Sequence, residues 1–181
     1  MSKLLAQPLG NPPAVPPREP VTAVVALGAN LGDRAATLAE AVEELRRLPL
    51  VDEVVASEPI DSVAVTLAGP DESEPSYLNA VALVRTRLAP SVLLAQLHAI
   101  EARHGRERRE RWGARTLDLD LVSYGDVVSD DPRLLLPHPR AAERDFVLAP
   151  WLEVQPDAVL PGRGRVSELL AALRAGAGGG A

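Results

Sequence analysis

Residues 116–124 read Thr-Leu-Asp-Leu-Asp-Leu-Val-Ser-Tyr, a pattern that is typical of a β-strand. Apolar and polar residues alternate along its first part, which is the period of a β-strand whose successive side chains point to opposite faces. On such a strand Asp118 and Asp120 share one face, while the neighbouring leucines share the other. We therefore expect a strand from Thr116 to Tyr124 whose leucines enter a core and whose carboxylates meet solvent or a ligand.

The chemistry of this segment indicates a polyphosphate site. Two adjacent carboxylates repel each other unless something positive lies between them. Mg²⁺ suits such a pair, because it takes oxygen ligands and usually shares them with substrate phosphates. The preceding residues, 103–115, are rich in arginine in a chain of formal net charge −6, and guanidinium groups bind phosphate oxygens as a fork. Taken alone, the same residues also fit a solvated basic face beside exposed strand carboxylates.

The composition is that of a globular protein with one core. The chain has 181 residues, of which 46% are hydrophobic and 24% charged, and it contains no cysteine. Disulfides and thiolate metal sites are therefore excluded. No apolar run approaches the ~20 residues of a membrane span, and the N-terminal run is too short for a signal peptide. We expect a cytoplasmic monomer, and the acidic balance argues against a dedicated nucleic-acid binder.

Periodicity predicts the elements in the rest of the chain. Strands are expected at Val21–Leu27, Val51–Ser57 and Tyr77–Leu88. Helices are expected from the N-cap Asp33 to Leu48, from Pro90 to about His104, and, more briefly, at Ala141–Pro150 and Val166–Leu173. Residues 58–76 show no periodicity and are expected to form a long loop. The order β-α-β, loop, β-α-β predicts an α+β fold of the ferredoxin-like (split βαβ) class: an antiparallel sheet with helices packed on it and C-terminal additions.

The two ends of the chain differ in composition from its middle. Residues 1–20 contain six prolines and are expected to be a flexible tail or the remnant of a fusion linker. Residues 175–181 are rich in glycine and are expected to be disordered. The sequence thus predicts one catalytic domain over residues 21–174.

Four blocks of sequence together resemble the 6-hydroxymethyl-7,8-dihydropterin pyrophosphokinase (2-amino-4-hydroxy-6-hydroxymethyldihydropteridine diphosphokinase) family of folate biosynthesis. The blocks are Ala-Leu-Gly-Ala-Asn-Leu-Gly-Asp-Arg at 26–34, Tyr-Leu-Asn-Ala-Val at 77–81, the signature within 100–120, and Leu-Pro-His-Pro-Arg at 136–140 with Glu-Arg-Asp-Phe-Val-Leu at 143–148. They occur in the family's order between about Val21 and Leu160. Each block alone is weak, and their joint occurrence carries the resemblance.

The resemblance implies an activity and a set of site residues. Members of the family transfer diphosphate from ATP to the hydroxymethyl group of a reduced pterin and release AMP. The metal ligands for two Mg²⁺ ions would be Asp118 and Asp120, and the catalytic residues would be Arg106, Arg115, Asp118 and Asp120. The residues binding ATP would be His98, Glu101, Arg106, Arg108, Arg111, Trp112, Arg115, His138 and Arg144. The residues binding the pterin would be Tyr77, Asn79, Trp112 and Phe146.

The chain departs from the family pattern at a few positions. Ala114 stands where the family usually has proline, and His98 replaces a usual glutamine. The basic segment is about one residue short. The largest departure is Glu-Pro-Ile-Asp-Ser-Val-Ala-Val-Thr at 58–66, where the family has a Tyr-x-Thr-x-Pro-like loop. Which residues of this segment contact the pterin is left open by the sequence.

Two other classes of protein share parts of the pattern. Asp-x-Asp also binds the metal in nucleotide-sugar glycosyltransferases, but their catalytic domains are generally larger and built on a Rossmann-like sheet. A ferredoxin-like RNA-binding module would need aromatic residues exposed on sheet strands within a basic surface. This chain has five aromatic residues and an acidic balance, which disfavours that alternative.

Overall fold

The computed structural model describes residues 19–62, 64–66, 69–71, 76–105 and 116–177. Its main sheet is antiparallel and has the strand order β2-β6-β1-β7. The four strands are β1 (Val21–Ala29), β2 (Val51–Ala56), β6 (Tyr77–Thr86) and β7 (Asp118–Tyr124). A short fifth strand, β3 (Ile60–Ser62), pairs with the first residues of β6.

Two helices join the strands in the order that the sequence predicts. Helix α1 (Arg34–Arg46) lies between β1 and β2, and α2 (Pro90–Arg103) lies between β6 and β7. The Oδ1 atom of Asp33 accepts a hydrogen bond of 3.0 Å from the N–H of Ala36, so the expected N-cap is confirmed. Two β-α-β units whose first strands, β1 and β6, are neighbours at the centre of the sheet form the ferredoxin-like arrangement. The predicted fold class is confirmed.

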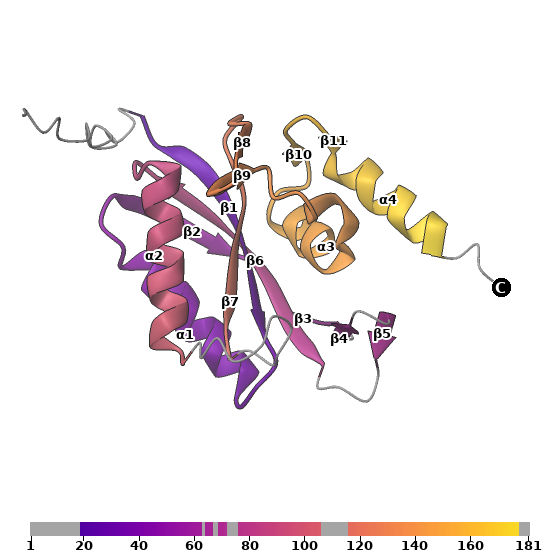
Figure 1. Cartoon of the computed structure of the whole chain (residues 1–181), viewed down its shortest axis with the longest axis horizontal. Helices are drawn as coiled ribbons and strands as arrows, with labels where there is room; N and C mark the ends of the chain where they lie inside the picture. The colour runs from indigo at the N-terminus through magenta and orange to yellow at the C-terminus, as the bar shows by residue number, and fades with distance from the viewer. Residues whose placement is uncertain (1–18, 63, 67–68, 72–75, 106–115, 178–181) are drawn as a thin grey trace, which may run out of the picture.

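The two faces of the sheet carry different layers. Figure 1 shows α1 and α2 on one side and α3 (Asp145–Val154) and α4 (Val166–Ala177) on the other. Each layer has its own core, because alternate residues of each strand face opposite ways. Leu27 and Leu119 are buried with α1 and α2, whereas Val24, Val81, Val122 and Trp151 are buried with α3 and α4.

Several elements differ from the expectations. The segment expected to be a loop contains β3, β4 (Ala64–Thr66) and β5 (Gly69–Asp71). Two further hairpins form, β8 (Ser129–Asp131) with β9 (Leu134–Leu136) and β10 (Val159–Leu160) with β11 (Gly164–Arg165). All seven strands have two or three residues, which is too short for alternation to show in a sequence.

The C-terminal helices are also displaced from their expected bounds. The helix expected at Ala141–Pro150 is divided into the 3₁₀ turn η1 (Ala141–Glu143) and α3, because Arg144 between them is extended, with φ −116° and ψ 98°. Helix α4 continues to Ala177, so residues 175–177 are helical rather than part of a disordered tail. No helix within the described ranges is both long and apolar enough to span a bilayer.

Candidate active site

The register of three strands brings the predicted site residues onto one face of the sheet. Gly28 on β1 pairs with Asn79 on β6 and with Asp118 on β7. Directly opposed residues share a face, so Asn79 and Asp118 flank Gly28 on the same side, roughly 10 Å apart across two strand spacings. Ala26 pairs with Asp120 in the next row of that face. Three blocks that are distant in the sequence thus meet on one face of the sheet.

Gly28 leaves the middle of this row without a side chain. A Cβ atom built there would lie 3.2 Å from Oδ1 of Asn79 and 3.9 Å from Cδ1 of Tyr77. Side-chain atoms of Tyr77 and Asn79, both on β6, therefore lie next to the glycine. We call this stretch of backbone, bounded by a phenol ring and an amide, the Gly28 floor; such a surface suits a flat heterocycle. In the sequence, the signal for this floor is a glycine that follows a run of β-branched residues.

The amide of Asn79 is held from a neighbouring strand. Asn79 is only 6% exposed, and its Nδ2 donates a hydrogen bond of 2.7 Å to Oγ of Ser62 on β3. Buried polar groups need such partners. Beside Ser62, Asp61 receives a hydrogen bond of 3.1 Å from Nη1 of Arg34, which also donates to the carbonyl oxygen and the hydroxyl of Ser76 at 2.8 Å.

The strand of the two carboxylates has the predicted alternation. Leu117 and Leu119 are buried, whereas Asp118 and Asp120 are half-buried on the opposite face. The side chain of Glu101 on α2 is 1% exposed and accepts a hydrogen bond of 2.9 Å from the N–H of Leu119. Because β7 is an edge strand, this carboxylate satisfies a backbone donor between the two aspartates.

Two residues of the later motif, Arg144 and His138, lie beside Asp120, and Phe146 lies against Arg144. The Nη1 atom of Arg144 lies 2.9 Å from Oδ2 of Asp120, and the guanidinium lies over the ring of Phe146, 5.7 Å from its centroid. The Nε2 atom of His138 lies 4.0 Å from the same Oδ2. His138 is positioned by its own backbone, whose N–H donates to the carbonyl oxygen of Val122 on β7 at 2.8 Å.

Burial controls the charge of His138. Its pKa is lowered from the usual value, first because burial disfavours the charged ring and then because Arg144 and Arg140 lie nearby. The carboxylate of Asp120 opposes this shift without reversing it. The neutral ring is therefore favoured at neutral pH. Because Nδ1 accepts a hydrogen bond of 3.2 Å from the N–H of Arg140, the proton of this neutral ring is on Nε2, which faces Asp120 as a donor.

Comparison with known proteins identifies the family. Residues 24–156 match the family model described as 7,8-dihydro-6-hydroxymethylpterin-pyrophosphokinase (HPPK). The chain belongs to this family. A 2-amino-4-hydroxy-6-hydroxymethyldihydropteridine pyrophosphokinase of Haemophilus influenzae is 39% identical over 150 residues, covering 83% of this chain and 91% of the relative. One of Methylorubrum extorquens is 41% identical over 151 residues, covering 83% and 92%.

Solved structures of HPPK-DHPS proteins have the same fold. An HPPK-DHPS in complex with substrates superposes with a TM-score of 0.63 at 10% identity, covering 85% of this chain and 43% of that chain. Plasmodium falciparum HPPK-DHPS wild type gives 0.63 at 12% identity, covering 85% and 41%. The chain thus spans less than half of these longer proteins, and at such identity the likeness shows the HPPK fold alone.

The two carboxylates fit the metal expected for an HPPK. Within the described ranges, no cluster of three or more His, Cys, Asp or Glu side chains could hold an ion by itself. Mg²⁺ commonly takes only one or two protein carboxylates and completes its shell with water and substrate phosphates. Asp118 and Asp120, on one face and half-buried, are such a pair. They would hold Mg²⁺ together with a polyphosphate.

The remaining predicted residues either lie away from Asp118 and Asp120 on α2 or belong to a segment that the structure does not describe. His98 is exposed on α2, one turn before Glu101. The basic segment 106–115 lies outside the described residues, so five predictions stay predictions: Arg106, Arg108, Arg111, Trp112 and Arg115.

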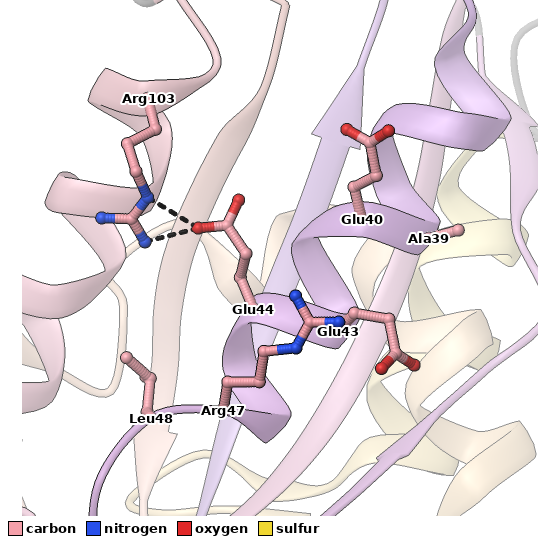
Figure 2. Close-up of a pocket in the computed structure, with 7 residues that line it drawn as sticks. All are labelled: Ala39, Glu40, Glu43, Glu44, Arg47, Leu48 and Arg103. Carbon is pink, nitrogen blue, oxygen red and sulfur yellow. Dashed lines mark hydrogen bonds and ion pairs between the residues drawn. The ribbon is translucent and has the colours of Figure 1, made fainter.

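A hollow on the other layer is distinct from this site. Figure 2 shows its charged lining on α1 and α2, which includes Glu40, Glu43, Arg47 and Arg103. The volume of the hollow is about 660 Å³. Glu44 lies at its edge and accepts hydrogen bonds of 2.7 Å from Nε of Arg103 and from the ring of His104. These contacts tie α1 to the end of α2 on the face opposite Asp118 and Asp120.

Sequence reasoning missed Ser62 and Arg34 as parts of the site. Arg34 follows the helix cap directly, but its partners are 27 and 42 residues away in the chain. Ser62 lies in the segment that departs most from the family pattern. No local pattern reports such pairings, and the three-residue strand that creates them is too short to be recognised.

Proposed function

We propose that this chain transfers diphosphate from ATP to the hydroxymethyl oxygen of 6-hydroxymethyl-7,8-dihydropterin, with Mg²⁺ required and AMP released. The supporting observation is the row Asn79–Gly28–Asp118, with Asp120 next on the same face. It puts a floor suited to a flat ring beside two carboxylates suited to a metal–polyphosphate complex. Membership of the HPPK family supports the same reaction class.

The pterin is proposed to lie over Gly28. Tyr77 would contact one face of the ring and Phe146, on α3, the other, because aromatic rings stack favourably on flat heterocycles. The Asn79 amide would hydrogen-bond the edge of the ring. Trp112 would add a further contact from the basic segment.

ATP is proposed to lie on the other side of the aspartates. Arg144 and His138 already lie beside Asp120, and a guanidinium that is stacked on a ring presents its fork to phosphate oxygens with little loss of freedom. Arg106, Arg108, Arg111 and Arg115 would bind the same chain of phosphates, with His98 and Glu101 near the nucleoside. Asp118 and Asp120 would hold two Mg²⁺ ions, which when bound neutralise phosphate charge.

The proposed reaction is a substitution at the β-phosphorus of ATP. The hydroxymethyl oxygen forms the new P–O bond, the bond to the α–β bridging oxygen breaks, AMP leaves, and the hydroxyl proton passes to solvent. Positioning and charge stabilisation supply most of the catalysis in phosphoryl transfer, so a dedicated general base is not required. The enzyme is further proposed to act as a monomer in the cytoplasm.

The test is AMP release from ATP with and without the hydroxymethyl pterin, at several Mg²⁺ concentrations. We expect AMP only when both pterin and Mg²⁺ are present. Asp118→Asn and Asp120→Asn should abolish most of the turnover even at saturating Mg²⁺, whereas Asp130→Asn on the exposed β8 hairpin should not. Formation of ADP, or no nucleotide product, would reject the proposal.

A further inference from the structure

We infer that Ser62 is a positioning residue for pterin recognition, because it holds the amide of Asn79 in place over the Gly28 floor. The inference rests on the proposed function, since it concerns how the pterin side of that site is built. Ser62 lies in 58–66, the segment whose contacts with the pterin the sequence leaves open.

The contact is short and partly shielded from water. The Nδ2 atom of Asn79 lies 2.7 Å from Oγ of Ser62, and Asn79 is 6% exposed. An asparagine side chain rotates freely about χ2 unless its amide is hydrogen-bonded. In a partly shielded site the Ser62 hydroxyl is therefore what selects one setting of the amide.

The orientation of the Asn79 amide determines which of its atoms faces a ligand on the Gly28 floor. With Nδ2 bonded to Ser62, Oδ1 of Asn79 lies on the side of Gly28, 3.2 Å from the position that a Cβ would occupy there. Gly28 in turn pairs with Asp118. The amide of Asn79 is thus fixed in the row Asn79–Gly28–Asp118. The pterin ring and its reacting hydroxymethyl group would have to lie along this row.

The strand that carries Ser62 is itself anchored. A strand of three residues is weak alone, but β3 pairs with β6 through Ile60–Asn79, Asp61–Leu78 and Ser62–Tyr77. Arg34 also joins Asp61 to Ser76, the residue before β6. Ser62 is therefore held on a fixed support, which a residue that orients another side chain requires.

The experiment compares Ser62→Ala with Ser62→Thr, which keeps the hydroxyl and suits a strand, and with Ser91→Ala on the exposed face of α2 as the matched control. We expect Ser62→Ala to raise the KM for the pterin by about 2- to 12-fold, the range of one net hydrogen bond. The KM for ATP and kcat should change by less than about twofold. Ser62→Thr should recover most of the loss, and Ser91→Ala should behave as wild type.

Two further measurements complete the test. Ser62→Ala should have no additional effect in an Asn79→Ala background, because a positioning residue acts only through its partner. In the ligand-free protein, the side-chain amide protons of Asn79 should exchange faster with water in Ser62→Ala, whatever the activity. A wild-type enzyme without pterin-dependent AMP release would reject the proposed function. An unchanged pterin KM, an equal rise in the KM for ATP, or unchanged amide exchange would reject the role of Ser62 alone.

Discussion

The guanidinium of Arg144 and the carboxylate of Asp120 form an ion pair, with Nη1 and Oδ2 separated by 2.9 Å. Their side chains are 22% and 31% exposed, so the pair is partly shielded from water. Arg144 is the extended residue between η1 and α3, and its guanidinium also lies over the ring of Phe146. One arginine therefore touches both a proposed metal ligand and a proposed pterin contact, and it couples the two halves of the site.

Replacement of Arg144 should weaken the ATP side of the site. Arg144→Ala removes a charged hydrogen-bond donor worth about 1.5–3 kcal/mol, so we expect kcat/KM for ATP to fall by roughly 10- to 150-fold. Arg144→Lys should recover only part of this, because an ammonium lacks the planar fork. Steady-state kinetics with varied ATP is the measurement. Arg133→Ala, which removes an exposed arginine paired with Asp131, is the control and should retain wild-type kinetics.

The sequence predicted the strand that carries Asp118 and Asp120, but not which residues lie opposite it in the sheet. The alternation around Asp118 gave the strand and its faces correctly, because a period of two is set by strand geometry alone. Which residues lie opposite one another is set by register, and no local pattern contains the pairing of Gly28 with Asn79 and Asp118. The resemblance named most of the residues, but the contacts of Ser62 arise from tertiary structure.

We expect Glu101 to stabilise β7, the strand that carries Asp118 and Asp120. Glu101→Ala leaves the buried N–H of Leu119 without its partner, and a buried unsatisfied donor costs about 1–3 kcal/mol. We expect a lower free energy of unfolding and a higher Mg²⁺ concentration for half-maximal rate, because Asp118 and Asp120 flank that N–H. Urea unfolding and Mg²⁺ titration of the rate measure the two effects.

Two variants separate the Glu101 contact from general helix effects. Glu101→Gln keeps an acceptor oxygen for Leu119 and should lose less stability than Glu101→Ala. Glu40→Ala changes an exposed residue of α1 and should leave both measurements near wild type. Equal stability of Glu101→Ala and wild type would show that the hydrogen bond to Leu119 contributes nothing.

Gly28 should tolerate no side chain if the pterin lies over it. In Gly28→Ala the new Cβ would approach Oδ1 of Asn79 to 3.2 Å, tight enough that Asn79 must shift. We expect the KM for the pterin to rise while the KM for ATP changes little. Overpacking of this kind costs about 1–3 kcal/mol of stability. Gly176→Ala on α4, with open space around it, is the control and should be neutral or stabilising by about 0.5–1 kcal/mol. A pterin KM equal to wild type would move the ring elsewhere.

Arg34 should affect the pterin side through β3. Arg34→Ala removes the links to Asp61 and Ser76, which hold β3 beside the first residues of β6. We expect a rise in the KM for the pterin and a modest loss of stability, about 1–2 kcal/mol for charged hydrogen bonds that are partly exposed. Arg87→Ala is the matched control, because Arg87 directly follows β6 at its far end and pairs with Asp52 on β2 at 2.8 Å. It should lose stability without a change in either KM, and a similar rise in pterin KM for both variants would contradict the positional argument.

The contacts of Glu44 predict a pH dependence of stability. Partial burial favours the neutral acid, but hydrogen bonds from Arg103 and His104 outweigh it and hold the pKa of Glu44 below its usual value of 4.5. The unfolded chain therefore takes up a proton at higher pH than the folded protein does. As pH falls from 4.5 through the folded pKa, the unfolding free energy falls, and the contribution of this carboxylate is complete only above that window.

Glu44→Gln removes this titration while keeping the shape of the side chain. Because Arg103 is 54% exposed, we expect the variant to be less stable than wild type by only about 0.2–1 kcal/mol above the window, and the difference should shrink as pH falls below 4.5. Urea unfolding of both proteins at pH values on each side of the window measures it. Glu43→Gln, one residue earlier on α1 and paired with Arg46, controls for the helix propensity of glutamine. A difference between Glu44→Gln and wild type that grows at lower pH would have the wrong sign, because it would require the folded protein to hold this proton more tightly than the unfolded chain.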